Sequence, residues 1–305
     1  MEKPVQKQTM RIAVITNPCS GGKRAVKMLP DVKAKFEGAG ITAEIFTSRH
    51  SSHIQEIAGS LDIDRYDAIA AMGGDGTNFH MINGLLSHHS SADLPPLAIL
   101  PAGSGNSFAR DLNIFDTDQA IAAIRRNRPR PVDMIAYTGG SGTFYFVNLM
   151  GAGFVTDVAV TASRFKYLHD LSYLIGVVRQ TVSIEATRME IDIDGKVCSG
   201  RFTFVEFCNS RFTGGNMLMA PDAKIDDGLM DIILVRELSR RELLLSLPKI
   251  YSGTHLDMDQ VTCIKGKSVK IITPDKEKTF LPDGEILGKT PGTLEVIPRA
   301  LRYLE

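Results

Sequence analysis

The sequence predicts an α/β domain with an open, mostly parallel sheet, followed by a β-rich domain. From Arg11 to about Val132, short apolar runs alternate with segments of helical periodicity, which is typical of a parallel sheet with helices on both faces. From about Asp133, strand-like runs are separated by turns, and Asp194-Gly195 between two of them is a hairpin signal. The length of 305 residues is sufficient for two domains.

Each element is expected from a local pattern of apolar residues. In the first half, strands are expected at 11–15, 41–46, 66–72 and 97–100, and helices at 25–38, 52–61 and 78–86. In the second half, strands are expected at 144–150, 188–194, 201–207, 230–235, 268–273 and 292–297, with one helix at 167–182. We expect a frayed tail at 1–10, the α/β domain at 11–133 and the β-rich domain at 134–297. The active cleft is expected between the two domains, where small-molecule sites often form.

The composition narrows the class of protein. Lysine plus arginine number 35, as do aspartate plus glutamate. The net charge of zero argues against nucleic-acid binding, which needs a basic field. The four cysteines lack metal-binding spacing, so we expect reduced thiols in a cytoplasmic protein. Neither a signal peptide nor an apolar run of about 18 residues is found. Membrane contact is therefore expected to be peripheral and transient, and a homodimer is left open.

The most informative motif is Gly73-Gly74-Asp75-Gly76-Thr77, which directly follows the apolar run 66–72. Glycines let the backbone approach a ligand closely, and their N–H groups can cradle phosphate oxygens. The next segment has helical periodicity, and a helix N-terminus attracts anions. A tight turn with incidental glycines would explain this motif if it stood alone. Because two further loops share the pattern, we favour a polyphosphate site.

Those two loops follow the strands 11–15 and 97–100 and cover residues 16–24 and 101–106. Ser104 and Asn106 can hydrogen-bond phosphate or sugar, and Arg110 adds a fixed positive charge with forked donors. Ligands of open α/β sheets gather at the carboxyl ends of the strands. Structural turns alone explain three such loops poorly. Neither a Walker A loop nor a dinucleotide-binding fingerprint is present.

With these residues the chain resembles the diacylglycerol kinase catalytic-domain family, which includes sphingosine and ceramide kinases and bacterial lipid kinases. The GGDGT loop at 73–77 and the PAGSGN loop at 101–106 are signatures of that family. The likeness continues through 214–217, 220–223, 226–231, 283–285 and 298–301. It implies an NAD kinase/phosphofructokinase-like first domain, a lipid-binding second domain and a C-terminal segment, 298–305, that returns to the first domain. The implied activity is ATP- and Mg²⁺-dependent phosphorylation of a lipid hydroxyl at a membrane surface.

The resemblance also assigns nucleotide-binding positions. The first loop would contact the nucleotide, the loop at 73–77 would cradle its phosphates, and the loop at 101–106 would lie alongside. The residues assigned to ATP are Asn17, Pro18, Ser20, Gly21, Thr47, Gly73, Gly74, Asp75, Gly76, Thr77, Gly103, Ser104 and Asn106.

The catalytic base is implied by the segment Asp283-Gly284-Glu285. Glu285 is the first candidate, with Asp283 beside it. In sphingosine kinases the aspartate of the GGDGT-like loop also lies near the lipid hydroxyl, which makes Asp75 a competitor. Without the resemblance, a plain hairpin turn would explain the run Pro-Asp-Gly.

Metal and lipid sites are implied in the second half of the chain. A structural metal of bacterial relatives implies a site at Asp227 with the backbone carbonyls of Lys224 and Leu229. Asp157 matches a lipid-recognising aspartate of sphingosine kinases, and Arg110 is the second candidate for substrate binding. The segment 165–175 is expected either to wall an acyl pocket or to form a buried core helix.

Two positions depart from the family pattern. His80 stands where members commonly carry glutamate, and Ser107 replaces an aspartate of bacterial lipid kinases, as in sphingosine and ceramide kinases. NAD kinases share GGDGT, but the second loop and the segments at 226–229 and 283–285 favour a lipid kinase. A catalytically silent lipid- or nucleotide-binding regulator is the other alternative. The acceptor, whether diacylglycerol, sphingoid base, ceramide or another lipid alcohol, stays open.

Overall fold

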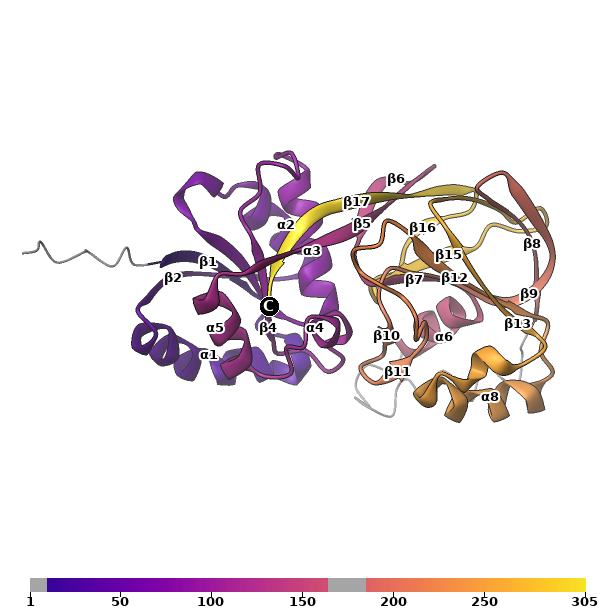
Figure 1. Ribbon diagram of the computed structural model, residues 1–305, viewed down its shortest axis with the longest axis horizontal. Coiled ribbons are helices and arrows are strands. Elements are labelled where there is room, and N and C mark those ends of the chain that lie inside the picture. Colours follow the sequence, from indigo (N-terminus) through magenta and orange to yellow (C-terminus); the bar gives the residue numbers. More distant parts are fainter. Residues whose placement is uncertain (1–9, 164–184) are drawn as a thin grey trace, which may run out of the picture. The chain divides into compact units, whose positions relative to one another are not determined.

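The computed structural model describes residues 10–163 and 185–305, and the chain forms two compact units (Figure 1). The first unit runs to Pro131 and also contains Leu301–Glu305, and the second is Val132–Ala300. Of the expected tail at 1–10, only Met10 is described, and it begins the first strand. The expected helix at 167–182 and the candidate acyl-pocket segment 165–175 lie outside the described residues.

The first unit is built on parallel strands in the order β2-β1-β3-β4. These strands are β1 (Met10–Thr16), β2 (Ile41–Thr47), β3 (Ala68–Gly73) and β4 (Leu97–Pro101). Both β3 and β4 are buried along their whole length, which explains why they read as continuous apolar runs in the sequence. The end of β17 (Gly292–Leu304) lies parallel to β4 through the pair Tyr303–Leu97.

Helices cover both faces of this sheet, with α1 and α5 on one face and α2 and α3 on the other (Figure 1). Their bounds are α1 Ser20–Gly38, α2 Ser51–Gly59, α3 Asp75–Leu86, α4 Ser107–Asp111 and α5 Thr117–Arg126, with a short 3-10 turn, η1, at Ile63–Arg65. Within α1, residues Gly21, Gly22 and Lys23 have left-handed φ of 55°, 66° and 71°. Regular helix therefore begins at Arg24, close to the expected start.

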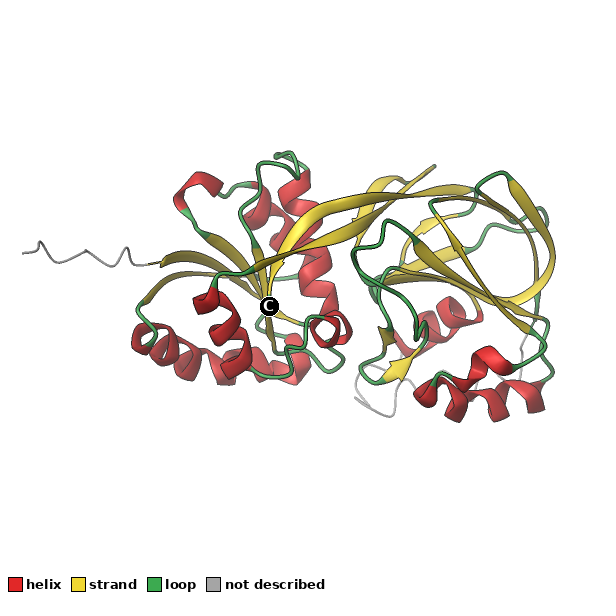
Figure 2. Ribbon diagram, in the orientation of Figure 1, coloured by secondary structure: helices red, strands yellow, loops and turns green. Residues whose placement is uncertain are grey.

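The second unit consists largely of strands (Figure 2). The long strand β9 organises it: its first half forms a hairpin with β8, and its second half lies between β7 and β12. Asp194 and Gly195 make the hairpin turn with φ of 50° and 85°. The strands are β5 Pro129–Gly139, β6 Gly142–Phe146, β7 Leu149–Gly153, β8 Thr187–Ile193, β9 Lys196–Cys208, β10 Phe212–Thr213, β11 Met217–Leu218, β12 Met230–Arg236, β13 Val261–Gly266, β14 Ser268–Ile272, β15 Thr279–Pro282 and β16 Leu287–Lys289.

Two helices, α6 (Phe154–Ser163) and α8 (Arg240–Ser252), pack on one face of β7, β9 and β12. A 3-10 turn, η3 (Thr254–Asp257), follows α8. The apolar cluster between them is completely or almost completely buried and includes Phe154, Phe204, Val235, Leu243 and Ile250. No helix within 10–163 or 185–305 is long and apolar enough to cross a bilayer.

The structure differs from the sequence expectations in several places. The single strand expected at 144–150 is two strands, β6 and β7, because the chain bends at Val147 and Asn148, whose amides turn toward the carboxylate of Asp283. The strand expected at 292–297 continues to Leu304 as β17. Elements that were not expected include helices α6 and α8 and strands β5, β13, β15 and β16. In α8, leucines on both the inner and the outer face blur the amphipathic pattern.

Candidate active site

The three glycine-containing loops of the first unit meet at the carboxyl edge of its sheet. Register pairs Thr16 with Met72 and Gly73 with Pro101, so β1, β3 and β4 end at the same level. The loops are tied by backbone hydrogen bonds. Asn17 N donates to Met72 O at 3.2 Å, and the amides of Ala102 and Gly103 donate to Gly73 O at 2.9 and 3.1 Å. The site predicted at this edge is therefore one continuous backbone surface.

Glycine is required where these loops touch. A Cβ on Gly103 would collide with Gly74 Cα, and one on Gly21 would collide with Ala102 O. A Cβ on Gly74 would lie 3.2 Å from Gly103 Cα and 3.9 Å from Ser20 Oγ. The three loops thus pack backbone against backbone, and bare backbone N–H groups are the donors that bind phosphate groups. This cradle fits a polyphosphate such as that of ATP.

Asp75 connects two of the loops. Its two carboxylate oxygens accept hydrogen bonds from the amides of Ser107 and Phe108, both at 3.0 Å. Burial raises the pKa of Asp75, whereas these amide hydrogen bonds act to lower it. Thr77 is buried, and its side chain occupies the space over Gly73 that a Cβ would fill. Both residues hold the loop in shape.

Asn106 stabilises the second loop from inside. With a left-handed φ of 55°, it accepts from Gly103 N at 2.9 Å and donates to Gly103 O at 3.0 Å. Arg24, which the sequence analysis missed, donates from Nη1 to the same Gly103 carbonyl at 3.2 Å. The signal was present in the sequence, because Arg24 directly ends the glycine-rich stretch of the first loop. Ser104 is left exposed at the tip of the second loop.

The remaining candidates of the first unit lie around this edge. Asn17 Oδ1 accepts from Cys19 N at 3.0 Å and shapes the first loop, which includes the partly exposed Pro18. Thr47 ends β2 and is exposed, and Gly76 lies in the first turn of α3. The guanidinium of Arg110 lies over the ring of Phe115, 5.7 Å from its centroid.

We expect Gly103→Ala to weaken nucleotide binding. The added methyl group forces Gly103 away from Gly74, which opens the cradle and costs roughly 1–3 kcal/mol of stability. Calorimetric titration with a non-hydrolysable ATP analogue and thermal unfolding measure the two effects. Gly140→Ala is the matched control, because a Cβ at Gly140 meets nothing within 4 Å. Equal affinity in both variants would contradict the role of this contact.

In the second unit, Asp283 and Glu285 have different surroundings. Asp283 is 5% exposed, and its carboxylate accepts from Val147 N at 3.4 Å and from Asn148 N and Leu149 N at 3.1 Å. Glu285 is only partly buried, and its amide donates to Pro282 O at 2.8 Å. Asp283 therefore anchors the bend between β6 and β7, whereas Glu285 is partly exposed.

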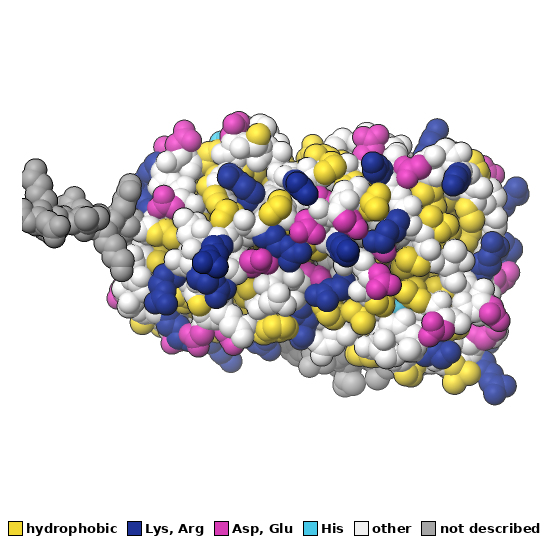
Figure 3. All heavy atoms as spheres, in the orientation of Figure 1, with side chains coloured by type: hydrophobic (Ala, Val, Ile, Leu, Met, Phe, Trp, Pro, Cys, Tyr) yellow, Lys and Arg dark blue, Asp and Glu magenta, His cyan; other side chains and the backbone are white. Residues whose placement is uncertain are grey.

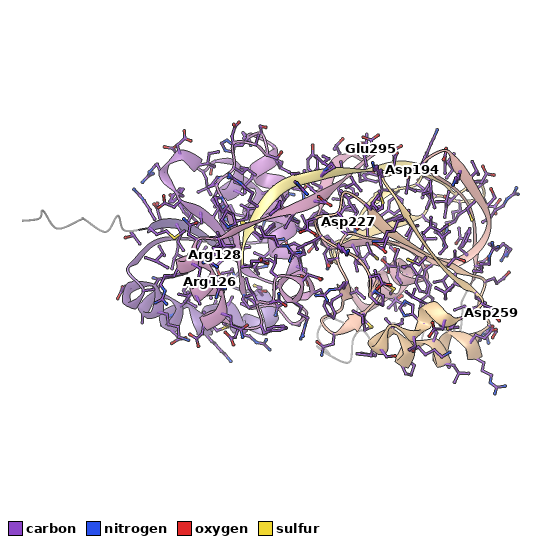
Figure 4. All side chains as sticks on the ribbon, viewed as in Figure 1. Arg126, Arg128, Asp194, Asp227, Asp259 and Glu295 are labelled. Carbon is purple, nitrogen blue, oxygen red and sulfur yellow. The ribbon has the colours of Figure 1, made fainter. Side chains whose placement is uncertain are left out.

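Asp227, the predicted metal ligand, is labelled in Figure 4, and both of its carboxylate oxygens have partners within the protein. Its Oδ1 accepts from Leu229 N at 3.1 Å, and its Oδ2 pairs with Lys265 Nζ at 3.2 Å. Lys265 also pairs with Asp231 at 3.0 Å, and Lys224 is exposed nearby. Lys265 thus places an ammonium group between the carboxylates of Asp227 and Asp231. Within the described ranges no cluster of three or more His, Cys, Asp or Glu side chains is suited to a metal.

Asp157, the candidate lipid-recognising residue, lies in α6. Its side chain is 45% exposed and pairs with Lys278 Nζ at 3.6 Å. Lys278 was not anticipated from the sequence. His80 lies within α3, with its ring edge-on to Phe79 at 5.4 Å between centroids.

Comparison with known proteins decides the family. The diacylglycerol kinase catalytic domain matches residues 11–137, and the YegS C-terminal NAD kinase beta sandwich-like domain matches residues 148–305. The chain belongs to the diacylglycerol kinase family. It is a lipid kinase, as the motifs predicted.

Individual relatives agree with this assignment. A diacylglycerol kinase of Staphylococcus saprophyticus is 31% identical to this chain, and the alignment covers 92% of this chain and 91% of the relative. Sphingosine kinase 1 of Arabidopsis thaliana is 26% identical to this chain, and the alignment covers 92% of this chain and 69% of the relative. The crystal structure of a proposed diacylglycerol kinase from Bacillus anthracis superposes with a TM-score of 0.79 at 25% identity, covering 98% of both chains. The predicted fold class, α/β followed by β-rich, is confirmed.

Proposed function

We propose that the protein transfers the γ-phosphate of ATP to the hydroxyl of a diacylglycerol or sphingoid-type lipid. The observation that carries the proposal is the backbone cradle of Gly21, Gly74 and Gly103 in a member of this kinase family. Phosphoryl transfer needs positioned phosphates, charge neutralisation and a base for the incoming hydroxyl. The cradle supplies the first requirement.

The donor would be held entirely by the first unit. Amides of the three loops would bind phosphate oxygens, with the exposed hydroxyl of Ser104 beside them. We propose Mg²⁺ as the ion that accompanies ATP, since it neutralises the phosphate charge during transfer. Asp75 would act mainly by positioning, because both of its oxygens hold the first turn of α4.

Glu285 would accept the proton of the lipid hydroxyl. The hydroxyl oxygen forms a bond to the γ-phosphorus, and the bond from that phosphorus to the β,γ-bridging oxygen breaks, so ADP leaves. The proton moves to the carboxylate of Glu285, whose accessibility suits this role better than the buried, amide-bound carboxylate of Asp283. The donor loops belong to the first unit and Glu285 to the second.

The acceptor class depends on Asp157. A carboxylate there can bind a sphingoid amine or a lipid hydroxyl, and relatives with names of both kinds match the chain. Asp157 is paired with Lys278 rather than isolated, which leaves less negative charge for an amine. We therefore favour a neutral lipid alcohol of the diacylglycerol type. A place in phospholipid biosynthesis would follow from that acceptor.

The test is transfer of labelled γ-phosphate from ATP with Mg²⁺ to lipids dispersed in detergent micelles. The panel comprises diacylglycerol, monoacylglycerol, sphingosine and ceramide, with NAD as the control. We expect label on diacylglycerol, and a shift of preference toward or away from sphingosine in Asp157→Asn. Label on NAD alone would overturn the lipid acceptor. Bound ATP without transfer to any acceptor would support a silent regulator instead.

A further inference from the structure

Helix α8 of the second unit exposes apolar side chains that the fold does not need. Its inner face is buried through Leu243, Ser246 and Ile250. On the outside, Leu244 is 49% exposed, Leu245 59% and Tyr251 62%. We call the exposed residues Arg240, Arg241, Leu244, Pro248 and Tyr251 the α8 outer face.

The spacing of these residues places them together. Leu244, Pro248 and Tyr251 follow at i, i+4 and i+7, so they form one stripe along the helix. Arg240 and Arg241 precede the two leucines by one turn. On the face drawn in Figure 3, hydrophobic and basic side chains gather with some acids at the lower right, where Figure 1 labels α8. An apolar stripe beside basic side chains is typical of helices that lie on an anionic membrane surface.

Local helix energetics do not account for the two arginines. They lie in the first turn, where the positive end of the helix dipole disfavours cations. The helix start is already secured by the capping box of Ser239 and Glu242. Neither arginine pairs with an acidic side chain within the described ranges 10–163 and 185–305. Their charge is therefore available to an external anionic partner.

The acids near α8 lie on its other side. Glu242 is used by the capping box and by Gln260 Nε2 at 3.1 Å. Asp257 and Asp259 line a hollow together with Leu245 and Lys249, and Figure 4 shows Asp259 beside α8. The helical positions of Leu245 and Lys249 are about a quarter turn or more from the stripe of Leu244 and Tyr251. On α8 itself, the edge with Arg240, Leu244 and Tyr251 therefore carries basic and apolar side chains, and Glu242, the one acid of the helix, lies away from it.

We propose that the α8 outer face docks on a bilayer containing anionic phospholipid, with Leu244 and Tyr251 entering the interface and both arginines at the head groups. A tyrosine suits this boundary because its ring is apolar and its hydroxyl polar. A second copy of the chain would offer the two arginines no acidic partner from the α8 outer face, so charge favours an anionic membrane. The inference rests on the proposed function only in that a lipid substrate resides in a membrane.

Vesicle co-sedimentation of the full chain tests the docking. One set of vesicles is phosphatidylcholine, and the other is an equal mixture of phosphatidylcholine and phosphatidylglycerol. We expect the parent to pellet with the mixed vesicles. Arg240→Gln/Arg241→Gln should weaken binding roughly 10- to 30-fold, and Leu244→Gln/Tyr251→Gln about tenfold or more. The control Lys196→Gln/Val197→Gln removes one exposed basic and one exposed apolar residue of the β8–β9 hairpin and should bind like the parent.

Several outcomes would overturn the docking proposal. In the first, the parent fails to bind mixed vesicles, and in the second, both α8 variants bind them as well as the parent does. In a third such outcome, the control variant loses as much vesicle binding as the α8 variants. A dimer in sedimentation velocity that only Leu244→Gln/Tyr251→Gln dissociates, without vesicle binding, would assign the face to a second copy. Lipid phosphorylation in detergent micelles is measured separately. If the parent binds mixed vesicles, only the α8 variants lose that binding, and the protein phosphorylates no lipid, the proposed function is refuted while the docking proposal stands.

Discussion

Glu285→Gln is expected to lower the rate of phosphoryl transfer by about 10²–10⁴-fold, the range typical of a lost general base. The amide keeps the size of the side chain but cannot accept the hydroxyl proton. Because Glu285 is partly exposed and lies in a turn, the melting temperature should stay close to that of the parent. Single-turnover transfer from labelled ATP, with micellar diacylglycerol in excess, measures the chemical step.

Two companion variants separate catalysis from folding. Asp283→Asn should reduce stability, because one oxygen cannot replace the carboxylate that accepts three backbone amides at the bend between β6 and β7. Glu277→Gln is the matched surface control, since the Glu277 side chain is 66% exposed and its ion pair with Lys289 Nζ is long at 3.8 Å. If Glu285→Gln retains transfer within a few-fold of Glu277→Gln, Glu285 is not the base and Asp75 becomes the candidate to test.

Glu206→Gln is expected to stabilise the protein, and more so at higher pH. Glu206 lies in β9, is 3% exposed, and its Oε2 has no hydrogen-bond partner. Burial raises the pKa of Glu206 from 4.5 to about 8. The folded state therefore keeps the proton between about pH 4.5 and 8, where the unfolded chain has lost it. By linkage the free energy of unfolding of the parent falls through this interval as pH rises, at a total cost on the order of 3–5 kcal/mol.

Urea unfolding at a series of pH values measures this effect. The difference between Glu206→Gln and the parent should be small near pH 4, grow steadily toward about pH 8 and then level off. Taking the difference removes other titrating groups such as Asp75, whose pKa is also raised by burial. A difference that stays constant across the series would show that Glu206 ionises normally in the folded protein.

Much of the proposed donor site was predictable because its signals are local in sequence. Each of the three loops directly follows a strand, and parallel strands bring their carboxyl ends to one edge. The sequence therefore predicts that Gly21, Gly74 and Gly103 lie together at that edge. The sequence pattern does not show that both carboxylate oxygens of Asp75 accept hydrogen bonds from the amides of Ser107 and Phe108. That contact depends on the mutual orientation of α3 and α4, which the sequence spacing does not specify.

The second unit was harder to predict because its important contacts join distant residues. The motif at 283–285 made both of its acids candidates for the catalytic base. In the structure, Asp283 accepts hydrogen bonds from three amides of 147–149, whereas Glu285 is partly exposed. The expected metal position at Asp227 is paired with Lys265, which lies 38 residues away in the chain. Helix α8 was missed because its inner and outer faces both carry leucine, which blurs the amphipathic pattern.

The sequence by itself determined the fold class, the strand-to-loop positions of the donor site and the family, since all three depend on short segments and their order. Only the tertiary structure decided which carboxylates are occupied by backbone amides or an ammonium group, which one is buried without a partner, and which helix face is left exposed. The physical reason is that the protonation and availability of a side chain depend on burial and on neighbours from other elements. Those neighbours are brought together only by folding.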